Sequence, residues 1–432
     1  MRVVIIGNSA AAVGAVESLR QHDQASEIVA ISEEPHGIYS RPMLSYLLAG
    51  EIDRPHLAYR PADFYSRHNV QPILNARVAS IDVAGHCVVT ESGQDYGYHK
   101  LLIATGGAPI VPPVPGIDSA GVFSFTRLDD TLGMLRYLEG SPVEQVIVVG
   151  GGMIGVKATD ALMKRGLRVT MVELAPRILS AALDETSSGL MARLLSDAAV
   201  EVITGGTVSA IHPEGGKGAA RGPSIAGVTL DSGRELACQM LVFGIGVRPN
   251  AALAREAGIA VNRGIVVDEY MRTSAPDVYA AGDVAEAYDL VVDMNRTVAI
   301  WPNAYRQGAI AGARMAGVSR ADPGAIAMNT VEVCGVPAMS IGNANVKDGP
   351  YEMMTELDER RVVYKRLTLE GDHLVGAILV GNISRAGIYT GLIRNKLDIS
   401  GCRKSLMTEH MSLLSLPTSY RKHIVSEAGI EV

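Results

Sequence analysis

The first three-quarters of the chain alternate between short apolar runs and longer segments in which apolar residues recur at helical spacing. The clearest runs are residues 3–6 and residues 146–149, which consist of Val and Ile alone. A β-branched run of this length is typical of a strand buried on both faces of a parallel sheet. Each run leads into a glycine-containing turn and then into a helical pattern. The sequence therefore predicts an α/β fold built on strand–turn–helix units.

The pattern changes from about residue 328 onward. Three short strand-like segments, at residues 330–333, 362–369 and 374–380, are followed by helix-like sequence. This change predicts a separate α+β domain. Residues 109–116 contain four prolines and indicate a linker that interrupts regular structure. Residues 244–250 indicate another crossing between domains.

The turn after the second apolar run predicts a dinucleotide site. Gly150, Gly152 and Gly155 fill all three glycine positions of the dinucleotide fingerprint, and Met153 and Ile154 open the helix that follows. Such glycines let the backbone approach a pyrophosphate closely. The helix N-terminus then supplies free N–H groups and a partial positive charge.

The turn after the first run is a weaker copy of this pattern. Gly7 holds the first position, but Ser9 and Ala12 stand where the second and third glycines belong, with Ala10 between them. Taken alone, this turn could equally be a plain tight connection from strand to helix. Two such sites in one chain imply two dinucleotides. The economical explanation is a relay in which one tightly held cofactor exchanges electrons with a second, diffusible one.

A carboxylate ends the strand that follows each turn. Residues 27–33 end on Glu33, and residues 168–173 end on Glu173. A carboxylate at this place accepts hydrogen bonds from a ribose 2′-hydroxyl. We therefore expect both glutamates to bind ribose, and we expect NADH to be preferred over NADPH because Glu173 would repel a 2′-phosphate. Arg177, four residues further on, could instead accommodate that phosphate.

Composition is that of a large enzyme. The 432 residues are 47% hydrophobic, which is enough for about three domains with their own cores. A net charge of −7 argues against nucleic acid or an anionic membrane as the main partner. The first apolar stretch stops at a glycine turn and is too short for a secretion signal. We expect no targeting segment, no membrane span and a cytoplasmic location.

The four cysteines lie far apart in the sequence, at Cys87, Cys238, Cys334 and Cys402. None of their spacings matches a metal site or an iron–sulfur cluster. We therefore expect no metal in this chain and expect the four thiols to be buried structural groups.

Several motifs together resemble the FAD- and NAD(P)-dependent pyridine-nucleotide reductases, in the branch that includes rubredoxin and ferredoxin reductases and the flavin module of assimilatory nitrite reductase. Besides the two glycine turns, they are residues 39–42 (YSRP), 104–106 (ATG), 244–249 (GIGVRP) and 273–283 (TSAPDVYAAGD). The resemblance covers nearly the whole chain and implies FAD and NAD(H) as cofactors. It also implies two Rossmann-like domains. The FAD domain, at residues 1–116 and 246–320, would be split by the NAD(H) domain at residues 117–245 and followed by a C-terminal α+β interface domain at residues 321–432.

The same resemblance implies roles for individual residues. Asp283 would bind the ribityl chain of FAD, Arg41 and Pro42 would lie beside the flavin, and Trp301 would lie on its other edge. Arg127 would lie near the FAD phosphate or the domain crossing. The remaining implied cofactor contacts are Val78, Thr105, Gly106, Gly246 and Gly282.

The chain departs from the family in two places. Many relatives carry a reactive cysteine beside the flavin, but no cysteine occurs between Met1 and His86. Without a nearby thiolate, disulfide or peroxide reduction by a thiol route is excluded. Lys157 stands where many relatives have glutamate, and a cation facing the flavin could favour hydride arrival. The alternative is a lysine on the helix surface, paired with Glu185 or another acid.

The C-terminal region resembles reductases that serve iron–sulfur partners, including NAD-linked subunits of complexes of the phenylglyoxylate dehydrogenase type. This resemblance implies transfer of electrons between NAD(H), FAD and an iron–sulfur centre on another polypeptide. The alternatives are a peroxide-forming NADH oxidase and a flavin-stabilised assembly factor. Family resemblance implies a homodimer, which a larger complex could replace. Residues that could form a basic docking face are Arg385, Arg394, Lys396, Arg403 and Lys404. Charges scattered in this way are also typical of an ordinary solvated surface.

Overall fold

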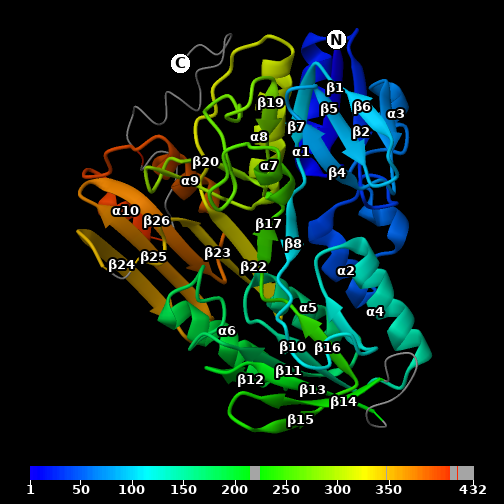
Figure 1. Ribbon diagram of the computed structural model, residues 1–432. Helices are drawn as coiled ribbons and strands as arrows, with labels where there is room; N and C mark the ends of the chain where they lie inside the picture. Colours follow the sequence, from blue (N-terminus) through cyan, green and yellow to red (C-terminus); the bar gives the residue numbers. More distant parts are fainter. Residues whose placement is uncertain (215–223, 347, 409–415, 417–432) are drawn as a thin grey trace. The chain divides into compact units, whose positions relative to one another are not determined.

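A computed structural model describes residues 1–214, 224–346, 348–408 and 416. It divides into two compact units, whose helices and strands are labelled in Figure 1. The first unit contains residues 1–112, 123–141 and 245–325, and the second contains residues 113–122, 142–244 and 326–432. Both units are therefore discontinuous in sequence. The finer domain boundaries at residues 116, 245 and 320 stay a prediction.

The first unit is built on a parallel sheet with the strand order β19-β7-β1-β2-β3. Its strands are β1 (Arg2–Ile6), β2 (Glu27–Ile31), β3 (Val70–Ile73), β7 (Lys100–Ile103) and β19 (Val278–Ala280). In β1 and β2 every residue after the first is buried, as the apolar runs predict. Residues 113–122 and 142–244 of the second unit lie between β7 and β19 in the sequence, although these two strands pair.

Two helices of the first unit pack with their backbones in close approach. They are α1 (Ala10–His22) and α8 (Trp301–Met315). A Cβ added at Gly308 would lie 2.0 Å from the carbonyl oxygen of Ala11, and one at Gly312 would lie 2.3 Å from that of Ala15. Only glycine permits this distance between the helices. The N-terminus of α1 is thereby fixed at the end of β1.

The first unit is completed by short elements. Its smaller strands are β4 (Val78–Asp82), β5 (Cys87–Thr90), β6 (Asp95–Gly97), β8 (Gly107–Pro109), β17 (Val247–Pro249), β18 (Ile265–Val266), β20 (Ala285–Asp289) and β21 (Met294–Arg296). Its other helices are η1 (Arg41–Met43), α2 (Leu44–Ala49), η2 (Arg54–Leu57), α3 (Phe64–Arg67), α4 (Leu128–Gly140) and α7 (Ala252–Glu256). The short strand β9 (Val122–Ser124) falls at the division between the units.

The second unit contains another parallel sheet, with the order β12-β11-β10-β16. Its strands are β10 (Gln145–Val149), β11 (Arg168–Glu173), β12 (Glu201–Thr204) and β16 (Met240–Phe243). An antiparallel sheet follows, made of β13 (Val208–Pro213), β14 (Ile225–Leu230) and β15 (Glu235–Ala237). The helices of this part are α5 (Met153–Lys164) and α6 (Glu185–Asp197).

The rest of the second unit is an antiparallel sheet with the order β22-β23-β26-β25-β24. Its elements are β22 (Met328–Val333), β23 (Val336–Gly342), β24 (Tyr351–Asp358), β25 (Val363–Glu370), β26 (His373–Val380), α9 (Ala386–Arg394) and α10 (Arg403–Met407). The three predicted strands are confirmed as β22, β25 and β26. Sequence reasoning missed β24, because it is an edge strand without a buried face, and β23, whose second residue is Pro337.

One hydrophobic cluster joins the two parts of the second unit. It includes Met171 and Leu179 from the nucleotide-type part and Val333, Tyr364 and Ile378 from the antiparallel sheet. The predicted α/β class with an added α+β part is confirmed. Among the described residues, no helix is long and apolar enough to cross a lipid bilayer.

Candidate functional site

The first glycine turn brings the end of β1 against the end of β7. Gly7 has φ +125°, and a Cβ there would lie 2.1 Å from the carbonyl oxygen of Ala104. Ser9 is the N-cap residue of α1, yet its side chain makes no capping hydrogen bond, and the first turn contains no acidic residue. Ala10 and Ala12 are buried. The positive end of α1 is thus left for an anionic group, so these residues fit a pyrophosphate.

Gly282 and Asp283 lie just beyond the end of β19, in the same sheet as β1. Gly282 has φ +84°, and its amide donates a 2.9 Å hydrogen bond to the Gln307 side chain on α8. Burial raises the pKa of the Asp283 carboxyl, against the attraction of the Arg41 guanidinium. A carboxylate held in this way suits hydrogen bonding to the hydroxyls of a polyol chain, as the predicted ribityl contact requires.

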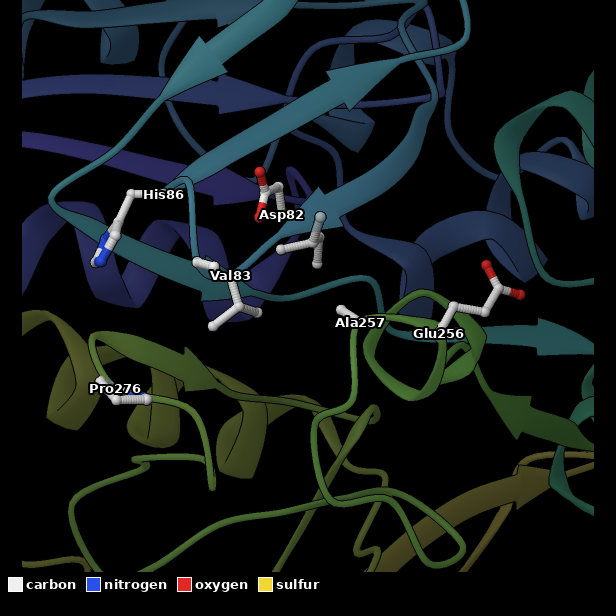
Figure 2. Close-up of a pocket in the computed structure, with 8 residues that line it drawn as sticks. Asp82, Val83, His86, Glu256, Ala257 and Pro276 are labelled. Carbon is white, nitrogen blue, oxygen red and sulfur yellow. The ribbon is translucent and has the colours of Figure 1, made fainter.

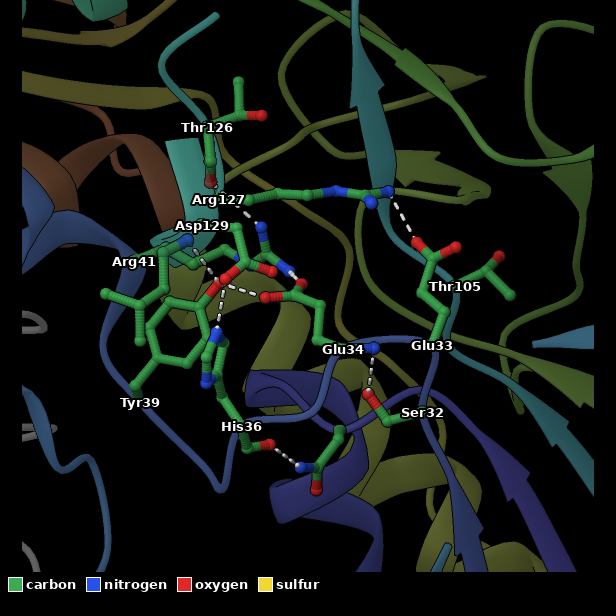
Figure 3. A network of polar contacts seen from close by, with 12 residues as sticks. Ser32, Glu33, Glu34, His36, Tyr39, Arg41, Thr105, Thr126, Arg127 and Asp129 are labelled. Atoms are coloured by element: carbon green, nitrogen blue, oxygen red, sulfur yellow. Dashed lines mark hydrogen bonds and ion pairs between the residues drawn. The ribbon is translucent and has the colours of Figure 1, made fainter. Parts of the chain in front are cut away.

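Arg41 is held by a network at the start of η1 (Figure 3). Its guanidinium pairs with Glu34 and donates a 2.9 Å hydrogen bond to the Thr126 carbonyl. The Tyr39 hydroxyl donates a 2.6 Å hydrogen bond to Glu34 and accepts one from the Leu128 amide. Burial lowers the pKa of Arg41, but its anionic neighbours outweigh this and raise it. The charge of Arg41 is therefore permanent and its position fixed, while Pro42 beside it is exposed.

Glu33 and Arg127 form a second pair in the same region (Figure 3). The Arg127 guanidinium contacts the Glu33 carboxylate, and both side chains are partly exposed. The Arg127 amide donates a 3.0 Å hydrogen bond to the Asp130 carboxylate in the first turn of α4. The negative charge of Glu33, the predicted ribose-binding residue, is thus balanced by a cation. Its carboxylate keeps lone pairs that can accept further hydrogen bonds.

The other predicted flavin-side residues lie on separate segments of the first unit. Thr105 and Asn250 exchange two 2.9 Å hydrogen bonds, and these join the segments after β7 and β17. Gly106 and Gly246 have φ +64° and +104°. Trp301 opens α8 and packs edge-on against Tyr59, with 5.0 Å between the ring centroids. Val78 lies on β4 and packs on the core. Whether these residues contact a cofactor stays a prediction.

The second glycine turn is tighter than the first. The Gly150 amide donates a 2.7 Å hydrogen bond to the Val172 carbonyl, and its φ is +111°. A Cβ on Gly155 would lie 1.7 Å from the carbonyl oxygen of Gly150. Gly152 is the N-cap residue of α5, which begins at Met153 and Ile154 and has no acidic residue in its first turn. These residues also fit a pyrophosphate at a helix N-terminus.

Glu173 at the end of β11 is bound by backbone amides. Its carboxylate accepts hydrogen bonds from the Gly151 amide and, at 2.7 Å, from the Ala175 amide. The ribose candidate of the second site is therefore held against the glycine turn itself. Lys157 is a partly buried residue of α5 in this unit, and its flavin-side role stays a prediction.

The cysteines are free thiols in four separate places. Cys238 is fully buried, and burial raises the pKa of its thiol to about 12. The expectation of burial is wrong for Cys334, which is exposed because it occupies, with φ +48°, the tight turn between β22 and β23. Within the described ranges, no three His, Cys, Asp or Glu side chains gather as a metal site.

A shallow pocket of about 620 Å³ lies elsewhere in the first unit (Figure 2). Its lining comes from the turn after β4, from the end of α7 and from Pro276, and it includes Asp82, His86 and Glu256. None of the predicted cofactor residues lines this pocket. It is therefore separate from the two glycine turns.

Sequence reasoning missed the residues that hold the predicted ones in place. In the first unit these are Glu34, Tyr39 and Gln307. In the second they are Asp184, Tyr364 and Arg366, which meet across 180 and 182 positions of sequence. Glu34 and Arg41 can both be seen in the sequence, but no sequence pattern indicates that they form an ion pair.

Comparison with known proteins agrees with this geometry. A relative 30% identical over 95% of this chain and 96% of its own length is the NADH-dependent phenylglyoxylate dehydrogenase subunit epsilon of Aromatoleum evansii. A nitrite reductase [NAD(P)H] of Bacillus subtilis is 29% identical over 95% of this chain, which spans 49% of that longer protein. The ferredoxin reductase for the CYP199A2 system of Rhodopseudomonas palustris shares the fold, with a TM-score of 0.85, 25% identity and coverage of 96% and 98%.

Two family patterns match the chain. Residues 328–397 match the rubredoxin NAD⁺ reductase C-terminal domain. Residues 1–308 match the pyridine nucleotide-disulphide oxidoreductases, a family that uses FAD and NAD(H). With one glycine turn of the dinucleotide type in each unit, the chain belongs to the pyridine nucleotide-disulphide oxidoreductase family.

Proposed function

We propose that this chain is an NADH-dependent flavoprotein that passes electrons between NAD(H) and an iron–sulfur protein. FAD binds in the first unit and NAD(H) in the second. The observation that carries this assignment is the presence of two glycine turns, each with an uncapped helix N-terminus and a carboxylate at the end of the neighbouring strand. The family match over residues 1–308 supports it.

The chain's own residues bind and orient the cofactors. When bound, a flavin accepts an electron pair from a nicotinamide and can release single electrons. Gly7 and the N-terminus of α1 hold the FAD pyrophosphate, Glu33 holds its ribose, and Asp283 holds its ribityl chain. Arg41, fixed by Glu34, supplies a constant positive charge in the same unit. Lys157 supplies a second cation, which favours the transfer of electrons to the flavin.

The acceptor is a separate polypeptide. The four thiols lie apart and provide no ligand set for a cluster within the described residues. One relative is a subunit of an NADH-dependent dehydrogenase, and one structural neighbour is a ferredoxin reductase. We therefore propose an iron–sulfur carrier or subunit as partner, in the cytoplasm, with this chain acting as a dimer or as one subunit of a complex.

The predicted basic docking face is only partly available. Arg403 contacts Glu352 at 2.8 Å and Asp372 at 3.0 Å, so its charge is locally balanced. Any docking by charge must therefore rest on Arg385, Arg394, Lys396 and Lys404.

Anaerobic mixing with a ferredoxin or rubredoxin tests the proposal. We expect NADH to bleach the flavin and the bleached protein to reduce the carrier. In a separate assay in air, without the carrier, oxygen consumption should be slow. Rapid, stoichiometric conversion of NADH and oxygen to hydrogen peroxide, with no reduction of the carrier, would instead identify an NADH oxidase.

A further inference from the structure

The loop between β11 and α6 links the second glycine turn to the antiparallel sheet. It comprises residues 174–184 and begins directly after Glu173. At its start, the Glu173 carboxylate binds the amides of Gly151 and Ala175. The conformation of this loop therefore fixes where the carboxylate points.

The middle of the loop also contacts the glycine turn. The Leu179 amide donates a 2.7 Å hydrogen bond to the Gly151 carbonyl. Leu179 has φ +51°, a conformation that is strained for a leucine and persists only where the surroundings hold it. A Cβ on Gly151 would lie 2.9 Å from the Ile178 side chain, so the loop lies directly on the turn.

The far end of the loop is anchored in the antiparallel sheet. Asp184 accepts a 2.6 Å hydrogen bond from the Tyr364 hydroxyl and a 3.0 Å one from the Arg366 guanidinium, both on β25. Asn345 donates a 2.7 Å hydrogen bond from its side chain to the Ser180 carbonyl. Ile178 and Leu179 share one hydrophobic cluster with the strands of this sheet. The sheet and its β23–β24 connection thus hold the loop through the Asp184 and Ser180 contacts and through one apolar cluster.

The Asp184 anchor is buried and charged. The Asp184 and Arg366 side chains are 9% and 12% exposed. Burial raises the pKa of Asp184, but hydrogen bonds from Ser187, Tyr364 and Arg366 outweigh it and lower the pKa. Because Asp184 also caps α6 through the Ser187 amide at 3.0 Å, loss of a partner would disturb the loop and the helix together.

We propose that the antiparallel sheet is part of the NAD(H) site: Asn345, Tyr364 and Arg366 are positioning residues that hold the loop, and through it Glu173, in the conformation that binds the ribose of NADH. This inference rests on the proposed function. It assigns nucleotide affinity and the preference for NADH over NADPH to residues that touch neither the glycine turn nor Glu173.

Equilibrium binding of NADH and NADPH to the FAD-loaded protein tests the proposal. The variants are Asn345→Ala, Tyr364→Phe and Arg366→Met, and the matched control is Arg193→Met. Arg193 lies on α6 and pairs with Glu359 at 3.7 Å, so it joins the same two parts of the unit through exposed side chains, away from the loop. FAD content and melting temperature are measured for each protein.

We expect Arg366→Met to raise the Kd for NADH about tenfold, the scale of a hydrogen bond to a charged group, and to reduce the preference for NADH. Asn345→Ala and Tyr364→Phe should each raise it about threefold, and Arg193→Met should leave it unchanged. FAD content should be constant, and Arg366→Lys should recover part of the affinity.

Equal Kd values for wild type, Asn345→Ala and Tyr364→Phe would overturn the inference even if Arg366→Met fails to fold. An equal loss in Arg193→Met would also overturn it, because any loosening of the unit would then suffice. If the wild-type protein itself binds no NADH, the proposed function fails instead, so the two failures are distinct.

Discussion

The two glycine turns have the same predicted role but differ in how much space they leave at the third fingerprint position. In the second, a Cβ on Gly155 would lie 1.7 Å from a carbonyl oxygen, so glycine is required at the third position. In the first, Ala12 occupies that position and is buried without disturbing α1. In the first unit, the close approach of two backbones instead occurs between α1 and α8, at Gly308 and Gly312. A departure from the fingerprint thus reflects where the backbone crowds, and need not mean loss of the site.

The carboxylates beside the two turns also differ in how rigidly they are held, and the second is again the tighter one. Glu173 is held by two backbone amides, one of them in the glycine turn. Glu33 is instead paired with the side chain of Arg127, at a partly exposed position. Backbone donors fix a carboxylate more rigidly than a long side chain does, because a side chain must lose rotamer freedom to hold its partner. We therefore expect sharper ribose discrimination at the second turn.

The largest effect should come from exchanging the third residue of each turn. Gly155→Ala should abolish NADH binding and destabilise the second unit by a few kcal/mol, because the added methyl group has no space. Ala12→Gly should cost only about 1 kcal/mol of helix stability and keep FAD. NADH titration, FAD content and thermal melting measure both. Gly189→Ala on α6, where an added Cβ meets nothing, is the control. Normal NADH binding by Gly155→Ala would show that the turn is looser than described.

The next effect should come from the two carboxylates. Glu173→Gln should reduce the NADH over NADPH preference by about tenfold or more, because a charge-assisted hydrogen bond to the 2′-hydroxyl and the repulsion of a 2′-phosphate are both lost. Glu33→Gln should change FAD retention only a few-fold and leave nucleotide preference intact. Steady-state kcat/KM for both nucleotides, together with FAD content, separates the two variants. An unchanged preference in Glu173→Gln would mean that its carboxylate does not meet the ribose.

Much of this architecture is visible in the sequence, and the reason is local. The apolar runs, the glycines and the two glutamates are each determined within about ten residues. The structure has the runs and glycines as predicted strands and turns; Glu173 is the last residue of β11, whereas Glu33 lies two residues beyond the end of β2. The anchors of the site are not local. Arg366 and Asp184 are 182 positions apart, and no pattern in either segment indicates the other. The pair Glu34 and Arg41 is only seven apart but needs the irregular loop between them to bend.

A smaller effect should appear in acid. The pKa of Asp184 lies below its unfolded value, so its stabilising contribution is present at neutral pH and is lost as pH falls through about 4 and below. Burial raises the pKa of Asp283, so protonation there instead relieves a cost of folding. NAD⁺ affinity should therefore fall on acidification before FAD is released. Asp184→Asn should abolish that pH dependence, and parallel loss of both ligands would contradict the distinction.

The smallest effect should come from the thiols. Replacing Cys87, Cys238, Cys334 and Cys402 together with Ser or Ala should leave flavin reduction by NADH unchanged in the folded protein, because the four thiols lie apart and none pairs with another. Anaerobic stopped-flow measurement of flavin bleaching checks this. A large loss of the bleaching rate, with normal FAD content, would place a thiol at one of the two sites.

The central claim is that one chain holds FAD at one turn and NAD(H) at the other. The most direct measurement is an anaerobic titration of the purified protein with NADH, followed by identification of the flavin released on denaturation. We predict that one equivalent of NADH per flavin bleaches the protein, that the released flavin is FAD, and that an added iron–sulfur carrier restores the colour. Release of FMN or no flavin, or a flavin that NADH leaves oxidised, would contradict the account.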